Sequence, residues 1–150
     1  MSRVAVLCGT ALLIACAPSG EQAGTADTAA APAAISLADV AGTWNLETAA
    51  MGSDSVLVTS QLMATGTMDG WMMMLPNRDP VPVRVLAVDA DSIVTEMGPF
   101  PSVLREGVMV TTRSVFKLRD STLAGRLTAQ YAGGGADSIV TLRSRGTRAQ

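Results

Sequence analysis

From Ile35 onward, the chain alternates short apolar, β-branched runs with turn residues that recur every eight to twelve positions. This spacing is typical of an all-β sandwich or barrel. No long helical pattern remains to carry parallel crossovers, so each strand is expected to pair with its neighbour in the chain. Residues 35–148 are therefore predicted to form one all-β domain, an eight-stranded antiparallel up-and-down barrel.

The expected strands follow from this alternation. Their ranges are 42–49, 55–64, 71–75, 81–88, 92–97, 108–118, 122–131 and 138–145. A short helical turn should precede the first strand, with Ser36 as its cap and Asp39 in its first turn.

The later strands have one apolar face with scattered hydroxyl groups and one charged face. An antiparallel sheet has this pattern when one of its sides is solvated. The other side then faces the barrel interior. Thr112, Ser114, Phe116 and Tyr131 lie on the apolar face and are the candidate ligand-facing residues.

The fourth and fifth expected strands are joined by Asp89-Ala90-Asp91. A three-residue loop there would set Val88 opposite Ser92. The same register sets Arg84 opposite Glu96, and opposite charges across a strand pair attract. We expect a solvated ion pair on the outer face; the alternative is a buried pair inside a pocket.

The residue inventory argues against catalysis. The chain has no histidine, and its only cysteines are Cys8 and Cys16. It therefore lacks the commonest general base, and no G-x-S-x-G sequence supplies an activated serine. With Lys117 and nine arginines spread among carboxylates after residue 34, nothing is basic enough to hold nucleic acid. The protein is expected not to be an enzyme and to carry no cofactor.

Two stretches carry side chains that metals bind, but neither has a full set of ligands. Met72 and Met74 share a strand face, and thioethers bind copper(I), but such sites usually include the imidazole that this chain lacks. The acidic turn at 89–91 suggests calcium, which needs about six to eight oxygen ligands that no local pattern provides. No metal is expected.

Trp71-Met72-Met73-Met74-Leu75 breaks the alternation, because both of its faces are apolar. Methionine fills irregular cores and also makes adaptable contact surfaces. Phe100 lies between two prolines in the expected connection 98–102, which would sit at a barrel rim. Trp71, Met72, Met74 and Phe100 are accordingly the candidate rim or contact surface; the alternative places them in the core.

Gly42-Thr43-Trp44 opens the first strand, directly after the helical turn. This resembles the G-x-W start of lipocalins and of bacterial lipocalin-like lipoproteins. The resemblance implies a barrel whose base is closed by Trp44, with an arginine from near the last strand packed across the indole. Arg143 and Arg145 are the candidates. The second lipocalin motif, T-D-x-x-Y, is absent. Residues 68–148 also resemble uncharacterised lipoproteins of environmental bacteria.

The N-terminal segment resembles the signal peptide of a bacterial lipoprotein. Arg3 is followed by an apolar run of eleven residues, Val4 to Ile14, which is too short to span a bilayer as a helix. Leu13-Ile14-Ala15-Cys16 resembles a lipobox, in which the signal is cut before a cysteine that then carries lipid, including palmitate. The expected signal peptide is therefore 1–15, with Cys16 lipidated. The alternative is an ordinary secretory signal that discards Cys16.

Residues 16–34 are rich in alanine and interrupted by Pro18, Gly20, Gly24 and Pro32. They have no periodic apolar face, so a flexible linker is expected, with a root-mean-square reach on the order of 25 Å. The residue after the cysteine is Ala17, not aspartate. By the resemblance, this favours the outer membrane facing the periplasm.

Two functions follow from this organisation. The first is a membrane-anchored extracytoplasmic lipoprotein whose barrel binds a small apolar or amphipathic ligand. The second is a structural or envelope-assembly module with a filled core. Interior volume separates them, since small barrels can be filled completely by side chains.

Overall fold

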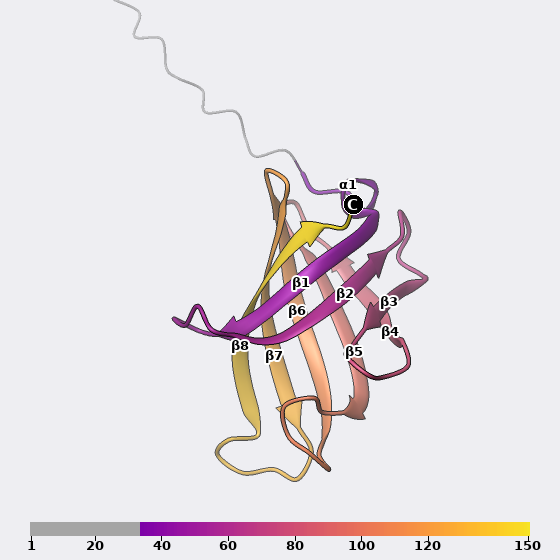
Figure 1. The fold of residues 1–150 in the computed structure, drawn as a ribbon. Helices are drawn as coiled ribbons and strands as arrows, with labels where there is room; N and C mark the ends of the chain where they lie inside the picture. The colour runs from indigo at the N-terminus through magenta and orange to yellow at the C-terminus, as the bar shows by residue number, and fades with distance from the viewer. Residues whose placement is uncertain (1–33) are drawn as a thin grey trace, which may run out of the picture.

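The structure is a computed structural model that describes residues 34–150. Eight antiparallel strands close into a barrel in chain order, β1 to β8, with β8 pairing with β1 (Figure 1). The all-β, up-and-down barrel expected from the alternation is confirmed. The signal peptide, Cys16 and the linker lie outside the described residues.

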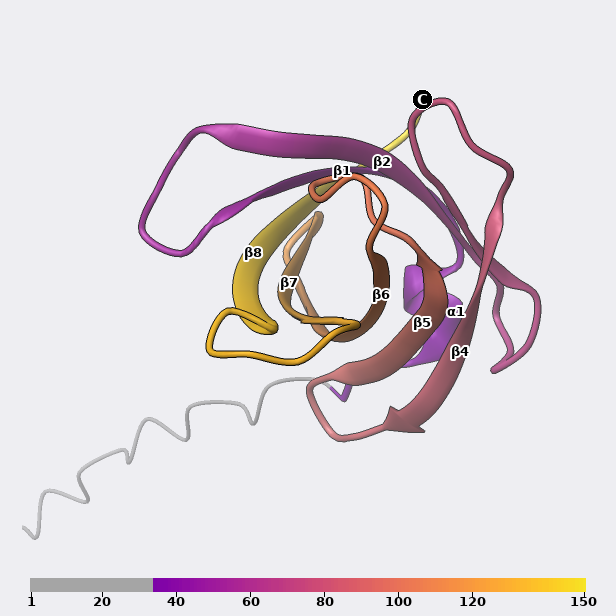
Figure 2. The same ribbon diagram turned by 90° about the horizontal axis from the view of Figure 1, so that it is seen from below.

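The elements are α1 (Leu37–Val40), β1 (Gly42–Ala50), β2 (Val56–Ala64), β3 (Trp71–Met74), β4 (Val81–Val88), β5 (Ile93–Pro101), β6 (Met109–Arg119), β7 (Thr122–Tyr131) and β8 (Ile139–Arg148). Seen from below, the strands form a closed ring (Figure 2). The helix α1 has the expected capping box: Ser36 Oγ accepts from the Asp39 amide at 3.2 Å, and the Asp39 carboxylate accepts from the Ser36 amide at 3.0 Å. No helix within residues 34–150 is both long and apolar enough to cross a membrane.

The β4–β5 hairpin differs from its expected register at the turn. Val88 pairs with Ile93, not with Ser92, so the loop has four residues. A register shift between Val85 and Ala87 offsets this difference, and Arg84 still pairs with Glu96. A β-bulge adds one residue to one strand, which is why an incorrect loop length gave a correct ion pair.

Strand β5 is longer than expected. It continues past the expected end at 97 through a bulge between Met97 and Phe100, and it includes a cis Gly98–Pro99 bond. Gly98 has a φ of +116°, and a Cβ atom there would lie 2.7 Å from the carbonyl oxygen of Val110. Glycine is therefore required at this position, where the backbone of β5 lies very close to that of β6. The segment that was expected to be a rim loop is part of the barrel wall.

One end of the barrel is closed as the G-x-W resemblance implies. Trp44 is fully buried, and its indole N–H donates to the Val40 carbonyl of α1 at 2.8 Å. The arginine packed over the Trp44 ring is Arg148, at 4.4 Å from the ring centroid. The candidates Arg143 and Arg145 were wrong. Both face outward from β8, whereas Arg148 pairs with Trp44 in the β1–β8 register.

Candidate functional site

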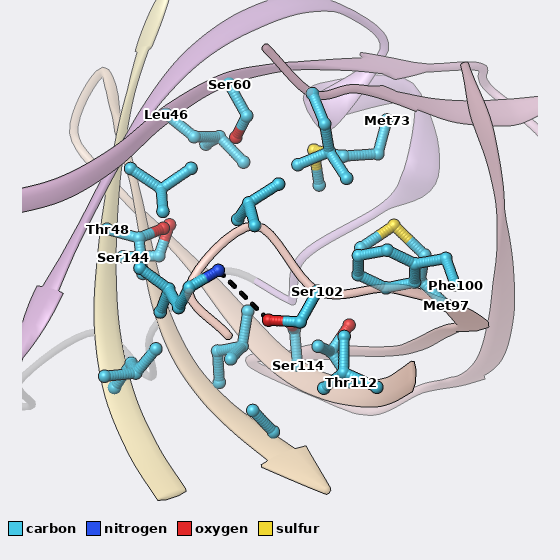
Figure 3. A pocket seen from close by; sticks show the side chains of 18 of the residues that line it. Leu46, Thr48, Ser60, Met73, Met97, Phe100, Ser102, Thr112, Ser114 and Ser144 are labelled. Atoms are coloured by element: carbon cyan, nitrogen blue, oxygen red, sulfur yellow. Dashed lines mark hydrogen bonds between the residues drawn. The ribbon is translucent and has the colours of Figure 1, made fainter. Parts of the chain in front are cut away.

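A cavity of about 70 Å³ lies inside the barrel. Figure 3 shows residues of the wall pointing into it from several strands, among them Leu46, Ser60 and Met73. The lining residues are Leu46, Thr48, Val58, Ser60, Met73, Leu75, Val83, Thr95, Met97, Phe100, Ser102, Val103, Leu104, Val110, Thr112, Ser114, Phe116, Leu127, Ala129, Tyr131, Leu142 and Ser144.

The lining is apolar with hydroxyl groups and without charge. Seven of its residues are serine or threonine, and they come from β1, β2, β5, β6, β8 and the β5–β6 loop. Within residues 34–150, no aspartate, glutamate, lysine or arginine lines this space. Burying an isolated charge costs far more than burying a hydroxyl group, so the interior suits an uncharged molecule or an uncharged part of one.

Ser144 gives the interior one unmatched polar group. The residue is 6% exposed, and its Oγ has no hydrogen-bond partner within residues 34–150. It pairs with Thr48 on β1 and with Gly125 on β7, so its neighbours in the wall are another hydroxyl and a residue without a side chain. Buried hydroxyl groups are normally paired, which makes Ser144 a feature that packing alone does not explain.

The β5–β6 loop covers part of the cavity at the end opposite α1. Ser102 Oγ accepts from the backbone N–H groups of Leu104 and Arg105, at 3.0 and 2.9 Å. Arg78, from the β3–β4 connection, donates to the Ser102 carbonyl at 2.8 Å and also to the Pro101 carbonyl. These bonds hold Val103 and Leu104 against the interior, where both line the cavity.

Arg105 holds the same loop from the other side. Its guanidinium carbon lies 3.9 Å from the centroid of the Tyr131 ring on β7. Because a cation over an aromatic face is attracted to it, this contact ties the loop to β7. The loop is thus fixed at two separate places, by Arg78 and by Arg105.

The candidate ligand-facing residues all line the cavity. Thr112, Ser114 and Phe116 follow each other along β6, and Tyr131 ends β7. Gly125 makes room for Phe116, since a Cβ atom on it would lie 2.8 Å from the ring. That these residues contact a ligand stays a prediction.

The candidate contact surface is wrong for two of its four residues. Trp71 is 1% exposed and donates its indole N–H to the Thr67 carbonyl at 2.9 Å, and Phe100 is 7% exposed and lines the cavity. Both are core residues because β3 and the extended β5 turn these side chains inward. Met72 and Met74 are half-buried on the other face of β3.

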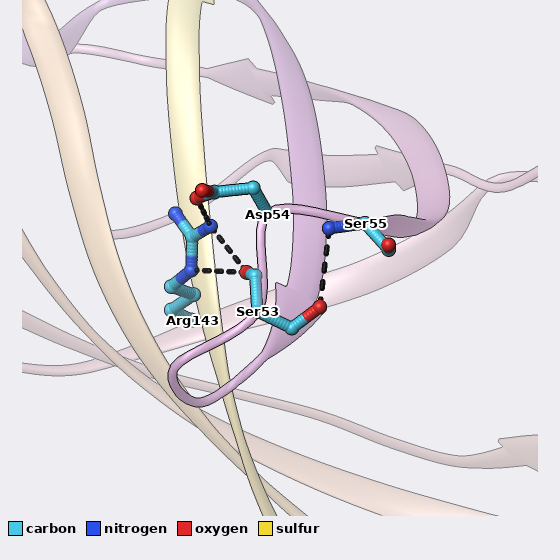
Figure 4. Close-up of polar contacts among 4 residues, drawn as sticks. All are labelled: Ser53, Asp54, Ser55 and Arg143. Atoms are coloured by element: carbon cyan, nitrogen blue, oxygen red, sulfur yellow. Dashed lines mark hydrogen bonds and ion pairs between the residues drawn. The ribbon is translucent and has the colours of Figure 1, made fainter.

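The charged groups are on the outer surface. Arg84 and Glu96 form an ion pair in which the arginine side chain is 70% exposed, so the expected solvated pair is confirmed. Arg143 donates to the Ser53 carbonyl and to the Asp54 carboxylate, at 3.0 and 2.6 Å, and thereby fixes the β1–β2 turn (Figure 4). Exposed pairs of this kind contribute little to stability.

A third surface pair joins Lys117 on β6 to Asp91 in the β4–β5 loop. The Lys117 hydrogen bond lowers the pKa of the Asp91 carboxyl group below its ordinary value. This side chain is exposed and on the outside, so it is not a buried acid of the kind that catalysis uses. The β4–β5 loop is thus held against β6 by this ion pair.

The sequence reasoning missed several lining residues, among them Thr48, Met97 and Ser144. The strand alternation contained the signal for two of them. Thr48 shares a face with Trp44 and Leu46, and Ser144 shares one with Leu142. Ser102 and Leu104 gave no such signal, because a loop has no side-chain period.

Among the described residues, no group of three or more aspartate, glutamate, cysteine or histidine residues is placed to hold a metal ion. Comparison of the chain with protein-family models, with curated proteins and with solved structures gave no match.

Proposed function

We propose that this protein is a membrane-anchored extracytoplasmic lipoprotein whose barrel binds a small, slender apolar or amphipathic ligand. The observation that carries the binding part is the unfilled barrel interior, whose lining within the described part of the chain includes seven serine and threonine residues and no charged residue. The anchoring part rests on the resemblance of 13–16 to a lipobox.

The lining supports binding over a purely structural role. A barrel selected only for stability would be expected to fill its centre with well-packed apolar side chains at crystal-like density. Here hydroxyl groups occupy inward positions such as Thr112 and Ser114, and the Ser144 hydroxyl has no hydrogen-bond partner among residues 34–150. In a core without a ligand, buried hydroxyl groups and unfilled volume lower the free energy of unfolding. A ligand in the cavity would fill the volume and could form hydrogen bonds with the hydroxyl groups.

The volume limits the ligand. Pockets for drug-sized molecules measure about 300–1,000 Å³. The interior, at about 70 Å³, is well below this range. It suits a single chain or a small ring, with some adjustment by the flexible side chains of Met73 and Met97.

Native mass spectrometry of residues 35–150, made without lipidation and exposed to bacterial lipid extract, tests the proposal. The expected result is a retained molecule that is released on unfolding. Ser114→Leu, which fills the interior from β6, should abolish retention. Thr111→Leu, at an outward-facing position of the same strand, should not. Absence of any retained molecule from the unmodified domain would contradict the binding proposal.

The small volume also favours a second candidate, a structural module of the cell envelope. If the remaining space holds no ligand in solution, the barrel would act through its outer surface. In that case Ser114→Leu should raise the free energy of unfolding, because it would fill a void in the core, and it should leave the structural role unchanged.

A further inference from the structure

A second hollow of about 440 Å³ lies on the barrel wall beside β2. It is lined by Leu57, Val58, Thr59, Pro76, Asn77, Arg78 and Val103. We call it the β2 groove. Unlike the interior, it lies within the size range of small-molecule sites, about 300–1,000 Å³.

The groove exists because the β2–β3 ladder is short. Strand β3 has four residues and pairs with β2 only at Gln61, Leu62 and Met63. Past Met74 the chain reaches Pro76, which has no N–H group to continue the ladder, and it turns away toward β4. Among residues 34–150, no strand therefore pairs on this side with the first half of β2, from Val56 to Ser60.

The groove and the interior adjoin each other at the edge of the wall. Val58 and Val103 line both spaces. Along β2, Val58 and Ser60 face the interior. The alternating positions Leu57 and Thr59 face outward, and they line the groove with Val58. The alkyl chain of a ligand that passes beside Val58 and Val103 would go from the groove to the interior without breaking a hydrogen bond between strands.

The two spaces differ in chemistry. The interior is apolar and uncharged, whereas the groove offers Thr59, Asn77 and the guanidinium group of Arg78. None of the three ion pairs found within residues 34–150 includes Arg78. Its hydrogen bonds go to the Pro101 and Ser102 carbonyls, which do not neutralise its charge.

We infer that the ligand is a single-chain amphiphile with an anionic head. The chain occupies the barrel interior and passes through the wall beside Val58, and the head lies in the β2 groove against Arg78. This inference rests on the proposed binding function and adds the ligand class, its orientation and its route.

Three ten-carbon probes separate these claims: decanoate, decanol and decyltrimethylammonium, each titrated at neutral pH into residues 35–150 by calorimetry. Decanoate should bind about threefold to fivefold more tightly than decanol, the gain expected for a partly exposed ion pair. Decyltrimethylammonium should bind most weakly. Binding of none of the three would overturn the proposed function itself. Equal binding of all three would leave that function standing and overturn only the inference.

Arg78 variants test the position of the head. Arg78→Gln should remove the preference for decanoate over decanol, measured as the ratio of their dissociation constants. Arg78→Lys keeps the charge but loses the forked donation to the two carbonyls, and it should keep the preference. If both variants weaken decanol and decanoate equally, Arg78 only holds the β5–β6 loop, and the head is not bound there.

Discussion

Ser144 and Ser102 show how the same residue type takes opposite roles in this barrel. Ser102 Oγ accepts two backbone N–H groups and so fixes the β5–β6 loop. Ser144 Oγ is buried and bonds to nothing among the described residues. A buried hydroxyl group without a partner costs about 1–3 kcal/mol, whereas a made hydrogen bond contributes about 0.5–1.5 kcal/mol.

Removing each hydroxyl group should therefore change the free energy of unfolding in opposite directions. Ser144→Ala should leave stability unchanged or raise it by up to about 1 kcal/mol, and Ser102→Ala should lower it by about 1–2 kcal/mol. Urea denaturation of residues 35–150, followed by tryptophan fluorescence, measures both. A clear loss of stability in Ser144→Ala would mean that its hydroxyl group is paired in solution.

The contact between Arg148 and Trp44 shows which parts of a single side-chain contact can be predicted from the sequence. The indole position was predictable from the Gly-x-Trp start. Alternation along β8 puts Leu142 on the face opposite Arg143 and Arg145, and this already excludes both arginines from packing over an inward-facing indole. Arg148 has the correct parity, but it lay beyond the expected end of the last strand at 145. The error was in the strand end, because the exposed, polar last residues of β8 give little sign of where pairing stops.

At the scale of elements, apolar runs separated by turn residues were sufficient to find every strand. Most of these runs alternate, because a half-buried strand buries only one face. Bulges were not predictable. The shifts at Val85/Ala87 and Met97/Phe100 each depend on how two strands meet, which no single strand encodes. The shift at Met97/Phe100 determines part of the cavity lining, because it continues β5 to Phe100 and turns that side chain into the cavity.

The gap beside β2 is a second element-scale feature that strand counting does not reveal. The expected strand 71–75 was nearly correct in length, and Pro76 marked its end. What was not predictable is that β2 extends well past its partner, because the pairing register is set by both strands and by the turn between them. The groove and its contact with the interior follow from that mismatch in length.

At the scale of the whole molecule, the two ends of the barrel differ. The end with α1 is sealed by Trp44 and Arg148, and the described chain begins there: the Ile35 amide donates to Ala90 of the β4–β5 loop at 3.0 Å. The cavity, the β5–β6 loop and the β2 groove lie toward the other end. An N-terminal tether would thus hold the protein by its sealed end and leave the ligand route free.

Anchoring by Cys16 can be tested in cells. Of Cys8 and Cys16, only Cys16 remains after the proposed cleavage. Cys16→Ser removes its thiol group, so lipidation at this position becomes impossible. The variant should move from the membrane fraction to the soluble fraction after cell lysis, while Cys8→Ser should stay with membranes. A Cys16→Ser protein that still fractionates with membranes would contradict the lipoprotein assignment.

The central claim is that a ligand chain enters the barrel interior, and the methionine methyl groups report on it directly. Met73 and Met97 line the cavity and are each 7% exposed, whereas Met63 and Met109 are 46% and 40% exposed on the outside. In residues 35–150 labelled with ¹³C at the methionine methyls, NMR with decanoate should give nuclear Overhauser contacts from the alkyl chain to Met73 and Met97. Contacts confined to Met63 and Met109, or no contacts at all, would contradict the claim.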